Sequence, residues 1–233
     1  MHFFYQPDLS GEFIYLDEDE SKHAIRVLRM TIGEQVEIVD GKGIRAVAEV
    51  TKDHPKRCEL RIVSRKTEES PRNYYLHIAV APTKNIERIE WFVEKAVEIG
   101  IDEISFLDCE HSERTVVKME RMEKVAVAAM KQSQQSRVPV IHAMKPFAEF
   151  VAESKSDVRL IAHCEEGAKN PVQKAIAGIK SILVLIGPEG DFSNEEIKLA
   201  VERGFVPTSL GETRLRTETA ALYTVMAAAI VTA

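Results

Sequence analysis

The sequence predicts an α/β protein in which a parallel β-sheet follows a small β-rich N-terminal module. Two observations predict the sheet: strand-like apolar runs alternate with helical patterns from Tyr74 onward, and two of these runs end in glycine-containing loops. Short stretches before residue 70 that alternate apolar with polar residues predict the module. With 233 residues, 45% of them hydrophobic, the chain is long enough for one sizeable core or two modest ones.

The N-terminal module is expected to hold one helix and several strands. Asp40-Gly41-Lys42-Gly43 is typical of a turn, and the segments on its two sides alternate as the strands of a hairpin do. The expected elements are a short helix over 21–30 and strands over 35–39, 44–50 and 58–64. The polar stretch 65–72 is the expected linker, so the predicted domains are 1–72 and 73–233.

The second domain is expected to alternate strands with helices, which is typical of a parallel sheet covered on both faces. The expected strands lie near 75–81, 104–107, 159–164, 182–186 and 206–210, and the expected helices near 86–97, 119–134, 194–203 and from Thr217 onward. Ser193, followed by two glutamates, is the expected cap of the third of these helices. Small residues in the last helix permit close packing in the core or against a second subunit.

Two loops near the C-terminus follow strand-like runs directly. The first is Gly187-Pro188-Glu189-Gly190, after the apolar run 181–186, and the second is Leu210-Gly211 followed by Leu215-Arg216-Thr217-Glu218-Thr219-Ala220. Parallel sheets place ligands at the carboxyl ends of their strands, where such loops lie. Two loops of this kind in tandem predict one bound small molecule.

Several function classes lack support in the sequence. No GxxxxGK[ST], GxGxxG, HExxH or GxSxG motif is present. The sequence therefore gives no support for a P-loop nucleotide hydrolase, a dinucleotide-binding enzyme, a zinc protease or a serine hydrolase. The three cysteines have no metal-site or disulfide spacing, and we interpret them as small buried hydrophobes. We expect no metal site, and we interpret His111, His142 and His163 as packing or surface histidines.

The ends of the chain indicate no targeting segment and no membrane span. Residues 1–7 lack the pattern of a signal peptide, and the apolar stretch 220–233 is too short and alanine-rich to cross a bilayer. The expected location is therefore the cytoplasm, without membrane association.

Charge is distributed unevenly along the chain. The formal net charge is -6, which argues against nucleic acid, but residues 22–66 carry 11 Lys and Arg against 6 Asp and Glu. In a helix over 21–30, Lys22, Arg26 and Arg29 would share one face, while Ile25 and Leu28 would lie on another. This pattern fits a helix that follows RNA phosphates, and it equally fits an ordinary solvated surface.

Seven segments of the sequence carry a resemblance to a known family. They are His23 with Val27-Leu28-Arg29, Lys84, Lys95 with Glu98-Ile99-Gly100, Ser112-Glu113-Arg114 with Val116-Val117, Arg137-Val138-Pro139, Gly187 to Ser193, and Leu210-Gly211-Glu212-Thr213-Arg214 continuing to Ala220. In these segments the chain resembles the ribosomal RNA small subunit methyltransferase E family, which belongs to the SPOUT superfamily of knotted methyltransferases. The resemblance extends over essentially the whole chain.

The resemblance implies a fold, a reaction and partners. The implied fold is a PUA-like RNA-binding β-barrel domain followed by a SPOUT α/β methyltransferase domain with a C-terminal trefoil knot. The implied reaction transfers a methyl group from S-adenosylmethionine to N3 of one uridine in 16S rRNA, within the assembled small ribosomal subunit. The implied assembly is a homodimer.

Site residues follow from the matched motifs. The predicted cofactor-binding residues are Ile186, Gly187, Pro188, Glu189, Gly190, Leu210, Gly211, Leu215, Arg216 and Thr219. The predicted RNA-binding residues are Lys22, His23, Arg26, Arg29 and Lys84. Arg114 and Arg137 are hypothesised to stabilise charge or bind phosphate, and Glu218 is the candidate base; structural ion pairs are the alternative for each.

The chain departs from the family pattern in two places. Asp191 stands where a second glycine is expected after Gly190, and Lys131 with Gln135 replaces the usual glutamate and arginine around Gln132.

Three other functions remain open: a SPOUT enzyme that acts on transfer RNA, a non-enzymatic RNA-binding ribosome assembly protein, and a small-molecule methyltransferase.

Overall fold

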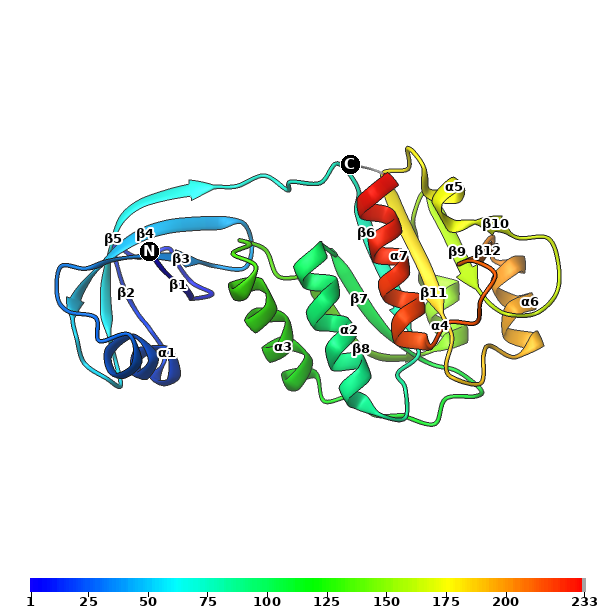
Figure 1. The fold of residues 1–233 in the computed structure, drawn as a ribbon, viewed down its shortest axis with the longest axis horizontal. Helices are drawn as coiled ribbons and strands as arrows, with labels where there is room; N and C mark the ends of the chain where they lie inside the picture. The colour runs from blue at the N-terminus through cyan, green and yellow to red at the C-terminus, as the bar shows by residue number, and fades with distance from the viewer. Residues whose placement is uncertain (232–233) are drawn as a thin grey trace. The chain divides into compact units, whose positions relative to one another are not determined.

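The computed structural model describes residues 1–231 and forms two compact units (Figure 1). One unit contains Met1–Pro71 and Val127–Val138, and the other contains Arg72–Ala126 and Pro139–Ala233. The predicted boundary after residue 72 separates two domains that are expected to fold independently, and it stays a prediction. The predicted boundary places Val127–Val138 in the second domain, whereas the structure groups this segment with the first unit.

The first unit is built on a five-stranded sheet in the order β1-β3-β4-β5-β2. Its strands are β1 (His2–Tyr5), β2 (Phe13–Tyr15), β3 (Gln35–Val39), β4 (Ile44–Lys52) and β5 (Glu59–Thr67). The predicted hairpin is confirmed as the antiparallel pair β3 and β4, whose inward residues alternate. Phe4, Ile38 and Leu60 are among the buried side chains that make this unit's core.

The predicted helix over 21–30 is shorter and less regular than expected. It consists of α1 (Glu18–Lys22) and the π-helical turn η1 (His23–Val27), and Asp17 caps its start by accepting the Glu20 N–H. Arg29 lies beyond the helix with a φ of 58°, so the predicted single face of Lys22, Arg26 and Arg29 is wrong. A π turn holds more residues than an α turn, and a 3.6-residue period does not foresee it.

The second unit is built on a seven-stranded sheet in the order β10-β12-β9-β11-β6-β7-β8, and every pair in it is parallel. Its strands are β6 (Tyr75–Val80), β7 (Glu103–Asp108), β8 (Val140–Pro146), β9 (Val158–Ala162), β10 (Asn170–Pro171), β11 (Ser181–Ile186) and β12 (Val206–Ser209). The central strands β6 and β11 are buried along almost their whole length, as their continuous apolar runs predict.

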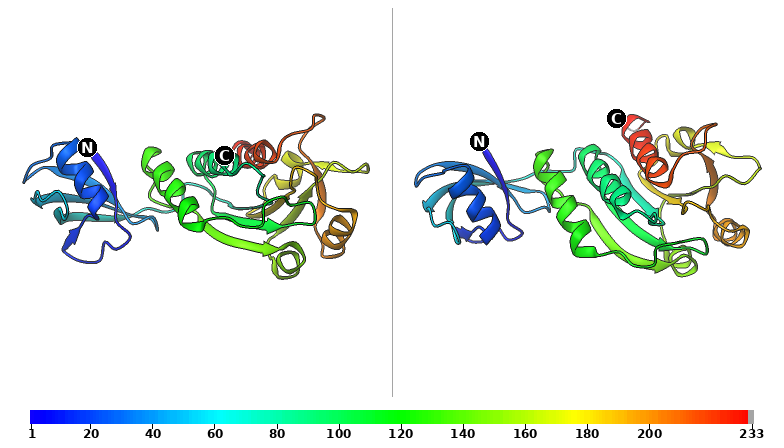
Figure 2. Two further views of the ribbon diagram at one scale, coloured as in Figure 1. Left: turned by 90° about the horizontal axis from the view of Figure 1, so that it is seen from below. Right: turned by 60° about the horizontal axis from the view of Figure 1, so that its bottom comes forward.

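Helices cover both faces of this sheet (Figure 2). They are α2 (Ile86–Ile99), α4 (Phe147–Glu153), α5 (Val172–Ile176), α6 (Asn194–Glu202) and α7 (Thr217–Val231). The remaining long helix, α3 (Met119–Gln132), begins in this unit, and its residues from Val127 onward belong to the first unit. α2 and α7 pack together on one face, and α4 and α6 lie on the other. Leu183 and Leu185 of β11 pack in one apolar cluster with Phe147 and Phe150 of α4.

The main strands and long helices of the second domain are confirmed, but several short elements were not predicted. β8 is an edge strand whose residues are mostly exposed or half-buried, so it lacks an apolar run, and α4 follows it directly. β1, β2, β10 and α5 have two to five residues each and are too short for a periodic signal. The trefoil knot implied by the resemblance stays a prediction.

None of the helices formed by residues 1–231 combines the length and the apolar character that crossing a membrane requires.

A buried polar cluster lies near the amino ends of β6 and β7. Nε2 of His77 lies 2.8 Å from Oγ of Ser105, and its Nδ1 lies 3.4 Å from Oε2 of Glu103. The other carboxylate oxygen of Glu103 accepts from His142 at 2.6 Å, and the His77 ring packs edge-on against Phe150. Burial lowers the pKa of His77 to about 4, so this imidazole is neutral at pH 7.

His77 makes the fold sensitive to acid. Between pH 6.5 and pH 4 the unfolded chain binds a proton at this histidine that the folded protein does not bind, so stability falls as the pH falls through this window. The shift corresponds to about 3 kcal/mol of unfolding free energy. Denaturant titrations from pH 7 to pH 4 should show this loss in the wild type and a smaller loss in His77→Gln. Equal losses in both proteins would contradict a neutral, buried His77.

Candidate functional site

A cavity of about 690 Å³ lies at the carboxyl edge of the parallel sheet in the second unit. The strand register creates it, because Ile186, the last residue of β11, lies beside Val80 of β6 and Ala162 of β9. Loops after all three strands therefore reach the same place, and the loop after β12 joins them. Eight of the ten predicted cofactor-binding residues line the cavity: Ile186, Gly187, Pro188, Glu189, Leu210, Gly211, Leu215 and Arg216.

The first loop folds tightly on itself. A Cβ at Gly187 would stand 3.1 Å from the ring of Phe192, so only glycine fits without displacing that ring. The Gly187 carbonyl accepts a hydrogen bond of 3.0 Å from the Thr217 hydroxyl, which ties the loop to the start of α7. Gly190 packs against His111 instead and does not line the cavity.

The second loop leaves β12 through a glycine turn. Gly211 has a φ of 122°, a conformation that L side chains rarely adopt, and open space surrounds the place of its missing Cβ. The Ser209 hydroxyl lies 3.2 Å from the Gly211 N–H and holds the turn. Leu215 is half-buried, and Thr219 is exposed outside the cavity lining.

Asp191 holds the first loop to a neighbouring strand. Its φ is 65°, in the left-handed region, and it stands at the position where the resemblance predicts a glycine. One carboxylate oxygen accepts the Cys164 N–H after β9 at 2.7 Å, and the other accepts the Phe192 N–H at 2.9 Å. These two bonds account for an aspartate at a position that would otherwise favour glycine.

Glu189 connects the first loop to the start of α2. Its Oε2 accepts the backbone N–H of Lys84 at 3.1 Å, and its Oε1 accepts from Nη1 of Arg88 at 3.2 Å. Lys84 and Arg88 line the cavity, and Nζ of Lys84 pairs with Glu113 at 2.7 Å. The sequence alone does not indicate a site role for Arg88, because its partner Glu189 lies 101 residues away.

Glu218, the candidate base, lies in the first turn of α7. Its side chain is only 9% exposed, and its Oε1 lies 3.9 Å from Nε of Arg88. Among the described residues its Oε2 has no hydrogen-bond partner, and Glu218 is not part of the cavity lining. Arg88 thus lies both beside the cavity and beside this buried carboxylate.

The two predicted catalytic arginines donate to backbone carbonyls. In the second unit, Arg114 donates through Nε to the Thr83 carbonyl at 3.1 Å and through Nη2 to the Lys84 carbonyl at 2.6 Å. In the first unit, Arg137 donates to the carbonyls of Lys42 and Glu68, each at 2.7 Å. Neither side chain lines the cavity.

Four of the predicted RNA-binding residues lie around α1 and η1 in the first unit. Lys22 pairs with Glu18 at 2.8 Å, and the exposed His23 lies edge-on to the Phe4 ring. Arg26 and Arg29 are exposed. The fifth, Lys84, lines the cavity of the second unit.

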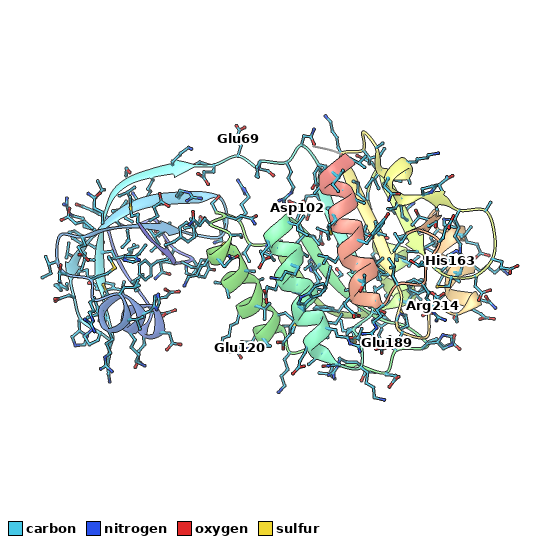
Figure 3. The ribbon with its side chains drawn as sticks, viewed as in Figure 1. Glu69, Asp102, Glu120, His163, Glu189 and Arg214 are labelled. Atoms are coloured by element: carbon cyan, nitrogen blue, oxygen red, sulfur yellow. The ribbon has the colours of Figure 1, made fainter. Side chains whose placement is uncertain are left out.

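Further lining residues come from the loop after β9 and from the second glycine loop. They include His163, Cys164, Lys169 and Arg214, and Figure 3 labels His163, Arg214 and Glu189 around the start of α7. The sequence predicts a packing or surface role for His163, and the structure places this residue in the cavity lining. The available signal was its place directly after β9, a strand that the sequence predicts and that lies beside β11.

Comparison with known proteins supplies the family. The RNA methyltransferase domain family matches residues 69–229, and the RNA methyltransferase PUA domain family matches residues 16–63. The ribosomal RNA small subunit methyltransferase E of Mycobacterium tuberculosis is 30% identical over 97% of this chain and 89% of its own length. This chain belongs to that family. The predicted fold class, a PUA-like domain with an α/β methyltransferase domain, is thereby confirmed.

Solved structures of the family superpose over almost the whole chain. A Porphyromonas gingivalis protein called "probable rRNA-methyltransferase" is 39% identical with a TM-score of 0.94, and the match covers 100% of this chain and 98% of that one. The ribosomal RNA small subunit methyltransferase E of Neisseria gonorrhoeae, solved bound to S-adenosyl methionine, is 26% identical with a TM-score of 0.86. That match covers 97% of this chain and 96% of the other. This chain is thus an RNA methyltransferase.

Replacing Asp191 should loosen the first loop. Asp191→Gly relieves a left-handed conformation worth roughly 1 kcal/mol, but it removes two hydrogen bonds to a charged group, each worth about 1.5–3 kcal/mol before solvent exposure reduces them. We expect a net loss of about 1–2 kcal/mol of unfolding free energy, measured by denaturant titration. Asp191→Asn keeps one of the two acceptor oxygens and should lose less. A glycine variant as stable as the wild type would contradict the role of these bonds.

Proposed function

We propose that this protein transfers the methyl group of S-adenosylmethionine to N3 of a uridine in 16S rRNA of the small ribosomal subunit. The observation that carries the proposal is the single cavity edge at which both glycine loops of the family motif meet. The names of the relatives support the substrate, and the bound S-adenosyl methionine in the Neisseria gonorrhoeae structure supports the cofactor.

The residues around the cavity fit this cofactor. Its volume of about 690 Å³ lies in the range of small-molecule sites. Ile186 and Leu215 offer apolar surface, and the open side of Gly211 lets a ligand approach the backbone closely. The residues proposed to hold it are Ile186, Gly187, Pro188, Glu189, Leu210, Gly211, Leu215 and Arg216, with Gly190 and Thr219 in support. Bound there, the cofactor supplies an electrophilic methyl group on a sulfonium.

The chain's own residues must orient the uracil and manage one proton. N3 of uracil loses its proton, and negative charge develops on the neighbouring carbonyl oxygens, so fixed donors near these oxygens lower the barrier. Arg114 is proposed to act by holding the loop that carries Lys84, since it donates to two carbonyls there. Glu218 remains the candidate base, because its Oε2 has no partner among the described residues. Arg137 is proposed to support the RNA-binding unit.

A homodimer is also proposed, and α7 is what supports it. This helix is apolar on nearly every side, and a helix of that kind is normally covered all round. Its inner residues pack on α2, β6 and β11, but Met226 is 46% exposed and Ile230 is 74% exposed. A second copy of the chain is proposed to cover this outer side. Cytoplasmic location is proposed from the substrate.

Methyl transfer tests the proposed reaction directly. Labelled S-adenosylmethionine should transfer its methyl group to small subunits that lack native modification, and mass spectrometry should identify N3-methyluridine in 16S rRNA. Label in transfer RNA instead would favour the other SPOUT substrate. Bound cofactor with RNA affinity but without transfer would favour a non-enzymatic assembly protein, and bound cofactor without RNA affinity would favour a small-molecule acceptor.

Arg114→Ala should impair the reaction while leaving the cofactor bound. The variant frees the carbonyls of Thr83 and Lys84, so the loop before α2 shifts, and a displacement of about 1 Å costs roughly 100-fold in rate. Turnover with unmodified subunits and calorimetric titration with S-adenosylmethionine are the two measurements. Arg121→Ala, which removes an exposed arginine paired with Glu90, is the control. Wild-type turnover in Arg114→Ala would reject the role.

A further inference from the structure

The basic side chains that line the cavity differ in whether the protein itself engages them. Lys84 pairs with Glu113, and Arg88 pairs with Glu189. Nζ of Lys169 donates to the carbonyls of His163 and Glu165. These three cations are held in place by partners from the same unit, and their charge or donors are already used.

Arg214 and Arg216 differ from this group, because both line the cavity and are exposed, and neither guanidinium has a partner within residues 1–231. Arg216 is already proposed to hold the cofactor, whereas Arg214 has no proposed role. Arg214 lies in the loop between β12 and α7. Within residues 1–231 its guanidinium makes no hydrogen bond and no ion pair. Leu215, the next residue, is half-buried, so the loop is anchored by its neighbour while Arg214 stays in solvent.

An unengaged guanidinium at the rim of a cavity is a receptor for an anion. Guanidinium groups match phosphate oxygens with paired N–H donors, and RNA offers a phosphate at every nucleotide. The cofactor offers one carboxylate and carries a net positive charge, so it is the weaker match for an exposed cation. The RNA strand also arrives from solvent, which is where Arg214 lies.

We propose that Arg214 binds a backbone phosphate of the RNA beside the nucleotide that enters the cavity. This inference rests on the proposed function. A phosphate held at the rim fixes the strand relative to the cavity, and it does so without reading the base sequence. Arg214 is thus a positioning residue for the methylated nucleotide, and it acts through the strand rather than on the reacting atoms.

The salt dependence of RNA binding separates this role from a structural one. Each phosphate contact contributes about 0.7 to 0.9 to the slope of log Kd against log salt concentration. We expect Arg214→Gln to weaken binding of unmodified small subunits, measured with S-adenosylhomocysteine present, about 10-fold and to lower that slope by about 0.7 to 0.9. Arg214→Lys should keep the slope, since it keeps the charge.

A matched control and a second ligand complete the experiment. Arg203→Gln removes an exposed arginine at the end of α6, outside the cavity lining, and should behave as the wild type does. Affinity for S-adenosylmethionine, measured by calorimetry, should be the same in Arg214→Gln and the wild type. A loss of cofactor affinity with unchanged subunit affinity would assign Arg214 to the cofactor carboxylate and overturn the proposal.

The remaining outcomes distinguish the two proposals. If the wild type methylates subunits and Arg214→Gln binds them with the same affinity and salt slope, this inference is rejected and the proposed function stands. If the wild type binds the cofactor but transfers no methyl group to subunits, the proposed function fails, and the role of Arg214 fails with it.

Discussion

The parallel register of β6, β9, β11 and β12 is the constraint on which the site depends. Ile186 of β11 lies beside Val80 and Ala162, and Ala162 lies beside Thr208 of β12, so four strands end at one level. The central strands are buried on both faces and carry apolar side chains that pack. The chemistry is therefore confined to the loops that follow the strands, and the register fixes the position of each loop relative to the others.

Carboxylates fix these loops through hydrogen bonds within the protein. Glu189 ties the first glycine loop to the start of α2, and Asp191 ties the same loop to the residue after β9. The Thr217 hydroxyl adds a bond from α7 to Gly187. Each bond joins segments that are far apart in the sequence, so the cavity wall is preorganised by the fold. Preorganised polar groups need no reorganisation when charge develops, which is the general requirement for electrostatic catalysis.

The elements with a regular hydrophobic period could be predicted from the sequence, whereas those defined by tertiary contacts could not. The apolar runs of β6 and β11 and the glycines after β11 and β12 predicted the parallel sheet and the place of the cavity. β8 was not predicted, because an exposed edge strand needs no apolar run. η1 was not predicted, because a π turn breaks the 3.6-residue period. The role of Arg88 was not predicted, because one arginine in a charged helix looks like any other until the structure shows Glu189 beside it.

The arginines of this chain show that a match to a family motif predicts the residue type more reliably than the role of its side chain. A guanidinium has five N–H donors, and each carbonyl it holds uses one. Arg114 donates from Nε and Nη2 to two carbonyls of the loop before α2. Arg137 donates from both Nη atoms to carbonyls of the first unit, and its buried Nε has no partner among the described residues. Arg214 has committed none of its donors within residues 1–231. The donors that remain free, rather than the residue type, determine which arginine can receive a substrate and which holds the structure that receives it.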